Sequence, residues 1–224
     1  MPVTKRYTVP KFWGVKLKEK KYVVSARPGP HSARGCVPLG LVLRDLLGHA
    51  KTMNEARMIL NSGVVRINGS VRKERGFPVG LMDVADIGGD FYRIVPAKSG
   101  LKLLKVSDPQ VRLAKIKNKT HVKKKKLQLN LHDGTNILAD GDFKTSDVAV
   151  IDIATGKITG TIKFEKGSFA VVTGGHNAGV KGTVESIDRK LRTIVMDTEG
   201  RKLVVPIKYV FVVGKGKPAV DIGE

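Results

Sequence analysis

A glycine-rich stretch at residues 174–184, GGHNAGVKGTV, contains residue types that could hold a phosphate group. Glycines let the backbone approach an anion closely, and a lysine followed by a threonine could contact phosphates and a magnesium ion. A nucleotide-binding P-loop requires that lysine directly after the second glycine of G-x-x-x-x-G. Here a valine precedes Lys181, Gly182 separates that lysine from Thr183, and no helical pattern follows. The spacing therefore excludes a P-loop, and the loop must serve another purpose.

Other side chains that could carry out chemistry are few and scattered. The single cysteine, Cys36, excludes an internal disulfide and any cysteine-based zinc site. The aspartates from Asp133 to Asp152 stand in turn-forming contexts such as DGTN and ADGDF, without the ligand spacing of a calcium loop. No two histidines have the spacing of metal ligands on a helix; the five are His31, His49, His121, His132 and His176. We therefore predict no catalytic residue, no bound metal and no cofactor.

The charge of the chain predicts an acidic partner. Its 224 residues include 41 Lys and Arg against 20 Asp and Glu, a net charge of +21 for which nucleic acid is the default partner. Residues 1–40 have nine basic residues against one acidic, and residues 98–126 have eleven against one, so these segments hold 18 of the 21 net charges. Residues 41–97 and 127–224 are nearly balanced, at +2 and +1. This pattern is typical of globular modules joined by cationic arms that contact phosphates.

The first basic segment, residues 1–38, has few large apolar residues to offset ordering costs of roughly 1–2 kcal/mol per residue. We expect it to be mobile alone and ordered only against a partner. Trp13 has two interpretations, packing against the next domain or stacking on a base. The segment lacks the apolar core of a signal peptide, and no run in the chain approaches the ~20 apolar residues of a membrane span. We expect a soluble protein of a reduced, cytoplasmic compartment.

Residues 39–90 predict two helices followed by a small sheet. An amphipathic helix with Arg44 and Lys51 on its polar side is indicated by apolar residues at Leu39, Val42, Leu43, Leu46 and Leu47. A second helix follows a capping box formed by Thr52 and Glu55, and runs to about residue 62. A glycine then supplies a left-handed end, VVRINGSV predicts a hairpin turning at Asn-Gly, and MDVADI predicts a third strand.

The rest of the sequence predicts β-structure. FYRIVP and LKLLKV are expected strands, and SDPQVRLAKIKNK has features of both a helix start and a strand. Its alternation and its partner LQLNLHDG favour a hairpin with a lysine-rich tip at 117–126. Small barrels are indicated by further short strands at intervals of about 10 residues: VAVIDI, KITGTIKF, SFAVVT, VKGTVESI, RTIVMDT, KLVVPI and YVFVV.

Two motifs resemble known modules. The pattern of the S4 RNA-binding module, L-R-D-x-L, an alanine-rich helix and G-x-V-x-[VI]-[ND]-G, is matched by LRDLL at 43–47, EARMIL at 55–60 and GVVRING at 63–69. The stretch at 174–184 with its preceding strand resembles a KOW motif, in which a glycine-rich turn between two strands of a five-stranded barrel contacts RNA or protein. In that setting the glycines allow positive φ, and His176, Asn177 and Lys181 offer polar groups.

In combination these motifs resemble the S4e family, the small-subunit ribosomal protein S4 of the archaeal and eukaryotic type. The resemblance extends over nearly the whole chain through RPGPH…GLMDV, KIKNK…LQLNLHDGTN and FEKGSFAVVTGGHNAGVKGTV. The N-terminal KRYTVPKFW only approximates the family's K-R-x-x-A-P-x-x-W, and the short C-terminus is more typical of archaeal members.

The resemblance implies an α+β, multidomain fold: a small αα-β RNA-binding module followed by two small, mostly antiparallel β-barrels, the last a five-stranded KOW-type barrel. The implied parts are a basic N-terminal extension (1–38), an S4-type RNA-binding domain (39–96), a central β domain with a lysine-rich hairpin tip (97–163) and a KOW-type barrel with the C-terminus (164–224).

The resemblance also implies a non-enzymatic constituent of the small ribosomal subunit that binds and stabilises rRNA during assembly and translation. Its partners would be small-subunit rRNA and neighbouring ribosomal proteins, without a membrane or a small-molecule substrate. The candidate rRNA contacts are Lys5, Arg6, Lys11, Trp13, Lys16, Lys18, Lys20, Lys21, Arg27, His31, Arg34, Arg44, Lys51, Arg57, Arg66, Arg72, Lys73, Arg75, Lys117, Lys119, Lys123, Lys124, Lys125, Lys126, His176, Asn177 and Lys181.

Two other functions remain open from the sequence. S4 modules also occur in RNA-modifying enzymes, but the aspartates here are better explained as turn residues than as catalytic groups. KOW motifs also occur in transcription and translation factors. If roughly ten cations contact phosphates, affinity falls on the order of 10³–10⁵ between ~50 and ~200 mM salt, which favours a permanent place within dense RNA over transient association.

Overall fold

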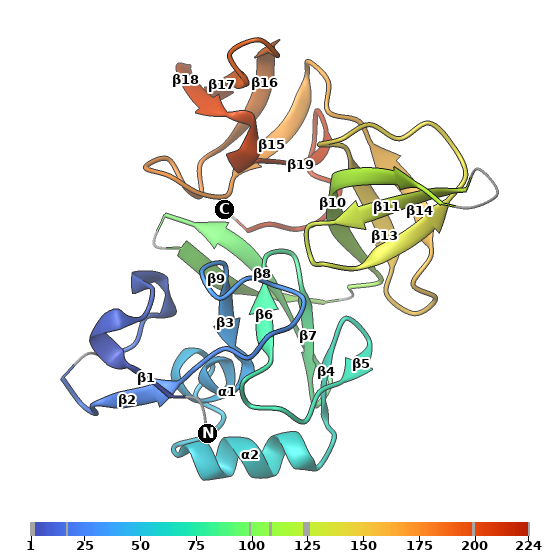
Figure 1. Cartoon of the computed structure of the whole chain (residues 1–224). Helices are drawn as coiled ribbons and strands as arrows, with labels where there is room; N and C mark the ends of the chain where they lie inside the picture. The colour runs from blue at the N-terminus through green and yellow to red at the C-terminus, as the bar shows by residue number, and fades with distance from the viewer. Residues whose placement is uncertain are drawn as a thin grey trace. The chain divides into compact units, whose positions relative to one another are not determined.

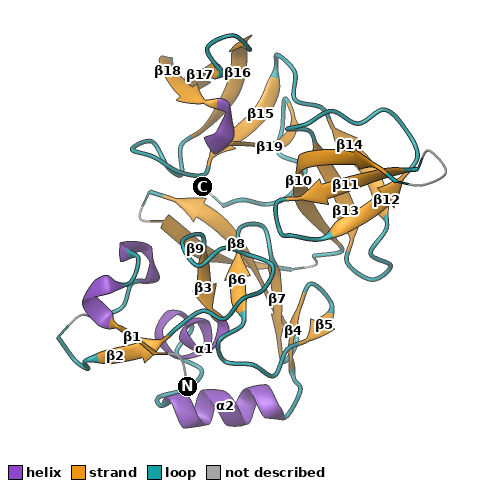
Figure 2. Cartoon of the chain, in the orientation of Figure 1, coloured by secondary structure: helices purple, strands orange, loops and turns teal. Residues whose placement is uncertain are grey.

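The computed structural model describes residues 3–16, 18–98, 100–107, 109–122, 126–198 and 200–223 (Figure 1). The chain forms two compact units: unit 1 comprises Met1–Val95 and Leu101–Pro109, and unit 2 comprises Pro96–Gly100 and Gln110–Glu224. Strands dominate both units (Figure 2). No helix within the described ranges is long and apolar enough to span a bilayer. The predicted α+β class, with several mostly antiparallel sheets, is confirmed.

The basic N-terminal segment is part of unit 1 and contributes to its core. Strand β1 (Val3–Lys5) pairs antiparallel with β2 (Tyr22–Val24), with the short 3-10 helices η1 (Arg6–Thr8) and η2 (Lys11–Trp13) between them. The Trp13 side chain is 3% exposed, and its Nε1 donates a hydrogen bond to the Cys36 carbonyl oxygen at 2.7 Å. The packing interpretation of this tryptophan is confirmed. The sequence predicts that this segment is ordered only against a partner. That prediction does not hold around Trp13, because the indole is buried in the core of unit 1.

The first predicted helix is present, but its end differs from the expected geometry. Helix α1 (Leu39–Leu41) continues as a π-helical segment, η3 (Val42–Leu46). The Leu47 amide donates to the Val42 carbonyl at 2.9 Å, a bond from residue i+5 to residue i. Because this turn is wider than an α-helical one, the apolar residues no longer share one face of the helix. Val42 is buried, whereas Leu46 is 36% exposed.

The second helix and the turns around it agree with the prediction. Helix α2 spans Met53–Asn61, and Gly63 follows it with φ of 78°. Ala56 and Leu60 face inward and are fully buried. The capping box, the apolar spacing and the terminal glycine are all local signals, which explains why the sequence alone located this helix.

Unit 1 also contains a five-stranded sheet in the order β5-β4-β7-β8-β9 and a separate pair, β3 with β6. The β4–β5 hairpin turns at Asn68 and Gly69 with φ of 50° and 79°, as the Asn-Gly pair predicted. The expected domain boundary after residue 96 falls within β8, and β9 lies beside β8 in the same sheet. The strands are β3 (Cys36–Pro38), β4 (Val65–Ile67), β5 (Ser70–Val71), β6 (Pro78–Gly80), β7 (Val84–Ile87), β8 (Asp90–Ala97) and β9 (Gly100–Val106).

Unit 2 contains two five-stranded sheets, in the orders β12-β11-β10-β13-β14 and β18-β17-β16-β15-β19. All the pairs in both sheets are antiparallel, and the predicted hairpin of β10 and β11 is confirmed. The strands are β10 (Val111–His121), β11 (Leu127–Leu131), β12 (Asn136–Ala139), β13 (Val148–Asp152), β14 (Ile158–Ile162), β15 (Ser168–Val172), β16 (Lys181–Asp188), β17 (Thr193–Thr198), β18 (Arg201–Pro206) and β19 (Val210–Lys215), with the 3-10 helix η5 (Ile207–Tyr209) before β19.

A partly buried lysine connects the two sheets of unit 2. The Lys115 amine on β10 donates hydrogen bonds to the carbonyl oxygens of Ile207 at 3.1 Å and Val210 at 2.7 Å. Nearby, the rings of His132 and Phe211 meet edge to face with centroids 5.4 Å apart. Burial, and then the charge of Lys117, lower the pKa of Lys115 to about 8. This lysine therefore serves the packing of unit 2 and is not available to a partner.

Candidate nucleic-acid interface

Helix α2 begins at a well-defined residue and so fixes the direction of the cationic side chains that it presents. The backbone amide of Glu55 donates to the Thr52 hydroxyl at 3.2 Å, and the Glu55 carboxylate accepts from the Lys51 amide at 2.8 Å. Hydrogen bonds from the Lys51 amide and the Thr52 hydroxyl hold the pKa of Glu55 below its usual value. The predicted capping box is confirmed. Because Ala56 faces the core, the next residue, Arg57, is exposed to solvent.

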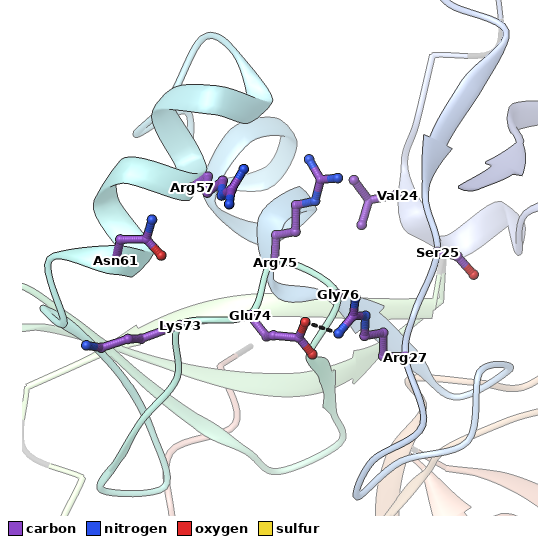
Figure 3. A pocket seen from close by; sticks show the side chains of 9 residues that line it. All are labelled: Val24, Ser25, Arg27, Arg57, Asn61, Lys73, Glu74, Arg75 and Gly76. Carbon is purple, nitrogen blue, oxygen red and sulfur yellow. Dashed lines mark ion pairs between the residues drawn. The ribbon is translucent and has the colours of Figure 1, made fainter. Parts of the chain in front are cut away.

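Four of the sequence-predicted cations meet at one pocket of about 270 Å³ on unit 1 (Figure 3). Its walls come from three segments that are distant in the sequence: the chain after β2, helix α2 and the loop before β6. Four lining side chains are positive and one is negative, so the pocket attracts anions. The lining residues are Val24, Ser25, Arg27, Arg57, Asn61, Lys73, Glu74, Arg75 and Gly76.

Two of the walls are held together by Arg27. Its amide donates to the Gly76 carbonyl at 2.8 Å, and its guanidinium forms an ion pair with Glu74 (Figure 3). A Cβ on Gly76 would lie 3.0 Å from the Arg27 Cγ, so the glycine permits this close approach. Among the residues that the structure describes, Arg57 and Lys73 form no ion pair. The positive charge of these two side chains is therefore not neutralised by an ion pair within the described part of the chain.

The other predicted cations of the S4-like module differ in their availability. Lys51 and Arg66 are exposed. Arg44 forms a two-pronged ion pair with Asp45, with Nε to Oδ1 at 3.0 Å and Nη2 to Oδ2 at 2.8 Å. Arg72 is partly buried, with its guanidinium 4.6 Å from the centre of the Phe77 ring. Of these side chains, Arg44 thus already has a carboxylate partner.

In the N-terminal segment, three of the predicted contacts are buried, so their side chains do not lie on the surface. Arg6 is 3% exposed, donates to the Lys16 carbonyl and lies 3.6 Å from a Glu19 carboxylate oxygen. Trp13 occupies the core, where a base could stack on it only after the core had opened. His31 is 8% exposed. The other predicted residues of the segment are exposed: Lys5, Lys11, Lys16, Lys18, Lys20, Lys21, Arg27 and Arg34.

His31 is held by a buried carboxylate. Its Nε2 lies 2.8 Å from Asp83 Oδ2, and the same carboxylate accepts hydrogen bonds from the Gly80 amide at 2.8 Å and the Asn68 side chain at 2.7 Å. Burial, and then the charge of Asp83, raise the pKa of Cys36 to about 11. The thiol is therefore protonated and unreactive at neutral pH. This cluster ties the N-terminal segment to the S4-like module.

The predicted lysine-rich tip of the β10–β11 hairpin lies partly within the described residues. Lys117, Lys119 and Lys126 are exposed, and the Lys119 amine donates to the Phe143 carbonyl at 3.0 Å. Lys123, Lys124 and Lys125, also predicted as contacts, lie outside the described residues. The positive charge of the described part therefore follows the strands as well as the turn.

The glycine-rich loop between β15 and β16 is shaped by close packing. A Cβ on Gly179, whose φ is 84°, would lie 2.6 Å from the backbone of Ala97 and Lys98. His176 is exposed and Asn177 is partly exposed, whereas the Lys181 amine donates to the Gly223 carbonyl. The loop glycine thus has a packing role, and of the three predicted contacts the histidine is the most available.

The acidic residues considered for catalysis form turns instead. Asp133 accepts hydrogen bonds from the Thr135 amide at 3.1 Å and pairs with Arg112. Burial alone would raise the pKa of Asp133, but the charge of Arg112 and the hydrogen bond from Thr135 outweigh it and lower the pKa. Asp152 likewise accepts from the Ala154 amide at 3.0 Å. Within the described residues, no group of three or more His, Cys, Asp and Glu could hold a metal ion.

Sequence reasoning missed a set of lysines in unit 2. Lys163, Lys166 and Lys215 line a groove of about 700 Å³ at one end of the C-terminal sheet. They stand in a part of the sequence whose net charge is close to zero, so counting charges gave no signal. The signal that could have found them is the pairing of the first and last strands of that sheet.

Comparison with known proteins gives the class and then the family. Three segments match family models: the RS4NT (NUC023) domain at residues 4–34, the S4 domain at 42–84 and Ribosomal family S4e at 88–158. The helices, hairpin and cationic pocket of unit 1 lie in the first two segments or close to them. The chain is therefore an S4-domain protein.

Full-length relatives extend this result. The Small ribosomal subunit protein eS4 of Archaeoglobus fulgidus is 41% identical over 229 residues, covering 98% of this chain and 97% of the relative. The protein of the same name from Methanosphaera stadtmanae is 39% identical over 97% of this chain and 94% of its own. A crystal structure of the 30S ribosomal protein S4e from Thermoplasma acidophilum superposes with a TM-score of 0.71 at 29% identity, covering 81% of this chain and 96% of that chain. The chain belongs to the S4e family of ribosomal proteins, a structural and non-enzymatic family.

Proposed function

We propose that the chain is a structural constituent of the small ribosomal subunit in the cytoplasm, where it binds small-subunit rRNA and stabilises its fold during assembly and translation. The observation that carries the proposal is the pocket at which Arg27, Arg57, Lys73 and Arg75 meet. Two of these cations have no ion pair among the described residues, so they can bind phosphates without breaking an internal ion pair. RNA phosphates are the densest anions that such a surface meets in a cell.

The remaining rRNA contacts are proposed where exposed positive side chains lie. Exposed lysines of the N-terminal segment and of the β10–β11 hairpin add to the pocket, and neighbouring small-subunit proteins complete the surroundings. Neutralised phosphates repel one another less, so RNA segments can approach closely around these side chains.

We propose that four parts of the chain contribute to rRNA binding. They are a basic extension (1–38), an S4-type RNA-binding domain (39–96), a central β domain (97–163) and a KOW-type β-barrel with the C-terminus (164–224). The sheet order β18-β17-β16-β15-β19 supports a five-stranded C-terminal module. The glycine-rich loop between its first two strands is the element that a KOW motif presents to a partner.

A pair of substitutions tests the pocket. The variant R57Q/K73Q is compared with K157Q/K190Q, which removes two exposed charges of unit 2 and so matches the change in net charge. Affinity for a full-length archaeal small-subunit rRNA transcript is measured between ~50 and ~300 mM salt. We expect R57Q/K73Q to lower the slope of log K against log salt by about 1.5, and the control pair to change it much less. Equal slopes for both variants contradict the proposal.

A wash experiment separates a permanent constituent from a transient factor. Small subunits that have incorporated the wild-type chain are sedimented through sucrose in low and moderately high salt. We expect the chain to remain on the particle in both, because many phosphate contacts must be broken at once. Complete release at low salt would favour a KOW-type factor.

A further inference from the structure

The groove of unit 2 is formed by two segments that strand pairing brings together. Residues 161–168 lead into β15, and residues 214–219 end β19 and follow it. Strands β15 and β19 are antiparallel neighbours, with Ser168 opposite Lys215 (Figure 1). We call the hollow of about 700 Å³ between these segments the β15–β19 groove. It lies at the beginning of β15, whereas the glycine-rich loop follows the end of the same strand.

The groove carries an excess of positive charge. Lys163, Lys166 and Lys215 line it, and each is exposed. Glu165 is the one acidic side chain among the lining residues. In the part of the chain that the structure describes, none of the three lysines forms an ion pair. The groove therefore has an excess of two positive charges in a unit whose C-terminal sequence is nearly neutral overall.

Two of the glycines that line the groove leave open space beside their backbone. Gly167 and Gly216 have φ of 83° and 71°, and a Cβ added at either would meet no atom within 4 Å. Their amides are already used: Gly167 donates to the Val184 carbonyl at 2.8 Å, and Gly216 donates to the Gly167 carbonyl at 3.2 Å. Recognition at the groove therefore depends on the lysine amines and on open space, because these two backbone amides are not available.

These features fit one kind of occupant. The volume lies within the range of small-molecule sites, but such sites are mostly apolar and aromatic, and no aromatic side chain lines this groove. A stable protein interface needs large apolar anchors at its centre, whereas the apolar lining consists of Ile162 and Ala219. Lysine amines around an open, glycine-lined surface suit a flexible chain of phosphates, for which geometry matters less than charge.

We propose that the β15–β19 groove binds the phosphodiester backbone of an RNA strand through Lys163, Lys166 and Lys215. This inference rests on the proposed function, since it adds a second rRNA-binding site to the one on unit 1. The three matched family segments end at residue 158, so the groove lies outside all of them. The C-terminal sheet would then contact RNA at the end opposite its glycine-rich loop.

The test uses the full chain with three variants. K163Q/K166Q/K215Q removes the groove charges, K163R/K166R/K215R keeps them, and K157Q/K190Q/K202Q removes three exposed charges elsewhere in unit 2. Each is titrated with a full-length archaeal small-subunit rRNA transcript at several salt concentrations, after thermal melting has shown that it folds like the wild type. We expect the glutamine groove variant to lower the salt slope by roughly 2, and the arginine variant and the control to stay close to the wild type.

Ultraviolet cross-linking on assembled small subunits locates the contact. We expect RNA-linked peptides that contain Lys163, Lys166 or Lys215. Equal slope changes for the groove and control variants would show that only net charge matters, and would overturn the inference. An unchanged rRNA affinity combined with loss of a neighbouring ribosomal protein from the particle would assign the groove to an acidic protein surface instead. If the wild type itself bound rRNA without salt dependence, the proposed function would fail, which is a separate outcome.

Discussion

The N-terminal segment and the β10–β11 hairpin have similar excesses of positive charge but are built differently. Residues 1–40 carry +8 and residues 98–126 carry +10. In the N-terminal segment, buried Trp13 and His31 tie the chain to the rest of unit 1, and buried Arg6 binds Lys16 and Glu19 within the segment. In the hairpin, β10 pairs with β13 only from Val111 to Lys115, and its basic remainder pairs with β11 alone. The first segment is thus anchored along its length, whereas the second is anchored at its base.

Charge density therefore does not decide whether a basic segment is anchored. Anchoring depends on a few side chains that can be buried together with a hydrogen-bonding group of the chain. In the N-terminal segment these are Arg6, Trp13 and His31, which find a carbonyl group or a carboxylate inside unit 1. In the hairpin the corresponding residue is Lys115, whose amine is bound by two carbonyl oxygens. Beyond it, the side chains of Lys117, Lys119 and Lys126 are exposed.

The largest expected effect is loss of the N-terminal anchor. We expect Trp13→Ala to lower the free energy of unfolding by about 3–5 kcal/mol, because a buried indole and its hydrogen bond to Cys36 are lost. The measurement is urea unfolding followed by circular dichroism. Tyr7→Ala is the matched control, since that ring is 68% exposed in the same segment, and we expect a change within about 0.5 kcal/mol. Equal effects of the two substitutions would show that the segment is not anchored.

The next effect concerns the base of the hairpin and depends on pH. The pKa of Lys115 is about 8 in the folded chain against an ordinary 10.5, so the unfolded chain binds more protons between these values. Stability from this group therefore rises as pH increases through that window. We expect the difference in unfolding free energy between wild type and Lys115→Met to shift in favour of the wild type by about 2 kcal/mol from pH 8 to pH 10.

Urea unfolding of both proteins at the two pH values gives this difference and cancels the titration of the other lysines. Lys157→Met, at an exposed position, is the control and should show no such shift. A constant difference would mean that the Lys115 amine titrates as it does in water.

The smallest effect is expected beyond the base of the hairpin. We expect K117Q/K119Q to leave the unfolding free energy within about 0.5 kcal/mol of the wild type, because both side chains are exposed. Affinity for the rRNA transcript should fall by about tenfold at ~0.1 M salt, with a loss of about 1.5 in the salt slope. Fluorescence anisotropy with K157Q/K190Q as control measures this. A large loss of stability with intact RNA affinity would reverse the roles of the two segments.

Much of the fold could be predicted because its signals are local. The capping box of α2, the Asn-Gly turn and the alternating strands each depend on neighbouring residues. The π-helical turn could not be predicted, since apolar spacing alone does not distinguish the hydrogen bond from Leu47 to Val42 from an ordinary helical one. The buried polar side chains were missed for another reason: Arg6 binds a carbonyl 10 residues away, and His31 lies against a carboxylate 52 residues away. Nothing in their local sequence separates them from exposed residues.

Some residues of the candidate site could likewise be predicted from a local motif, and others could not. The S4 motif led to Arg57 and Lys73, and the structure placed these side chains in one pocket with Arg27 and Arg75. The lysines of the β15–β19 groove could not be found by counting charges, because nearby acidic residues in the sequence balance them. Only the register of β15 with β19 brings Lys163 and Lys215 to the same surface.

The strand order of the C-terminal sheet also has a consequence for biosynthesis. Its earliest strand, β15, needs β19 as a neighbour, and β19 is translated only after the three strands between them. A nascent chain can therefore expose the hairpin lysines to RNA well before this sheet is complete. Capture of RNA would begin at the hairpin, and a translation product halted before β19 would enter assembling particles with one side of its last module missing.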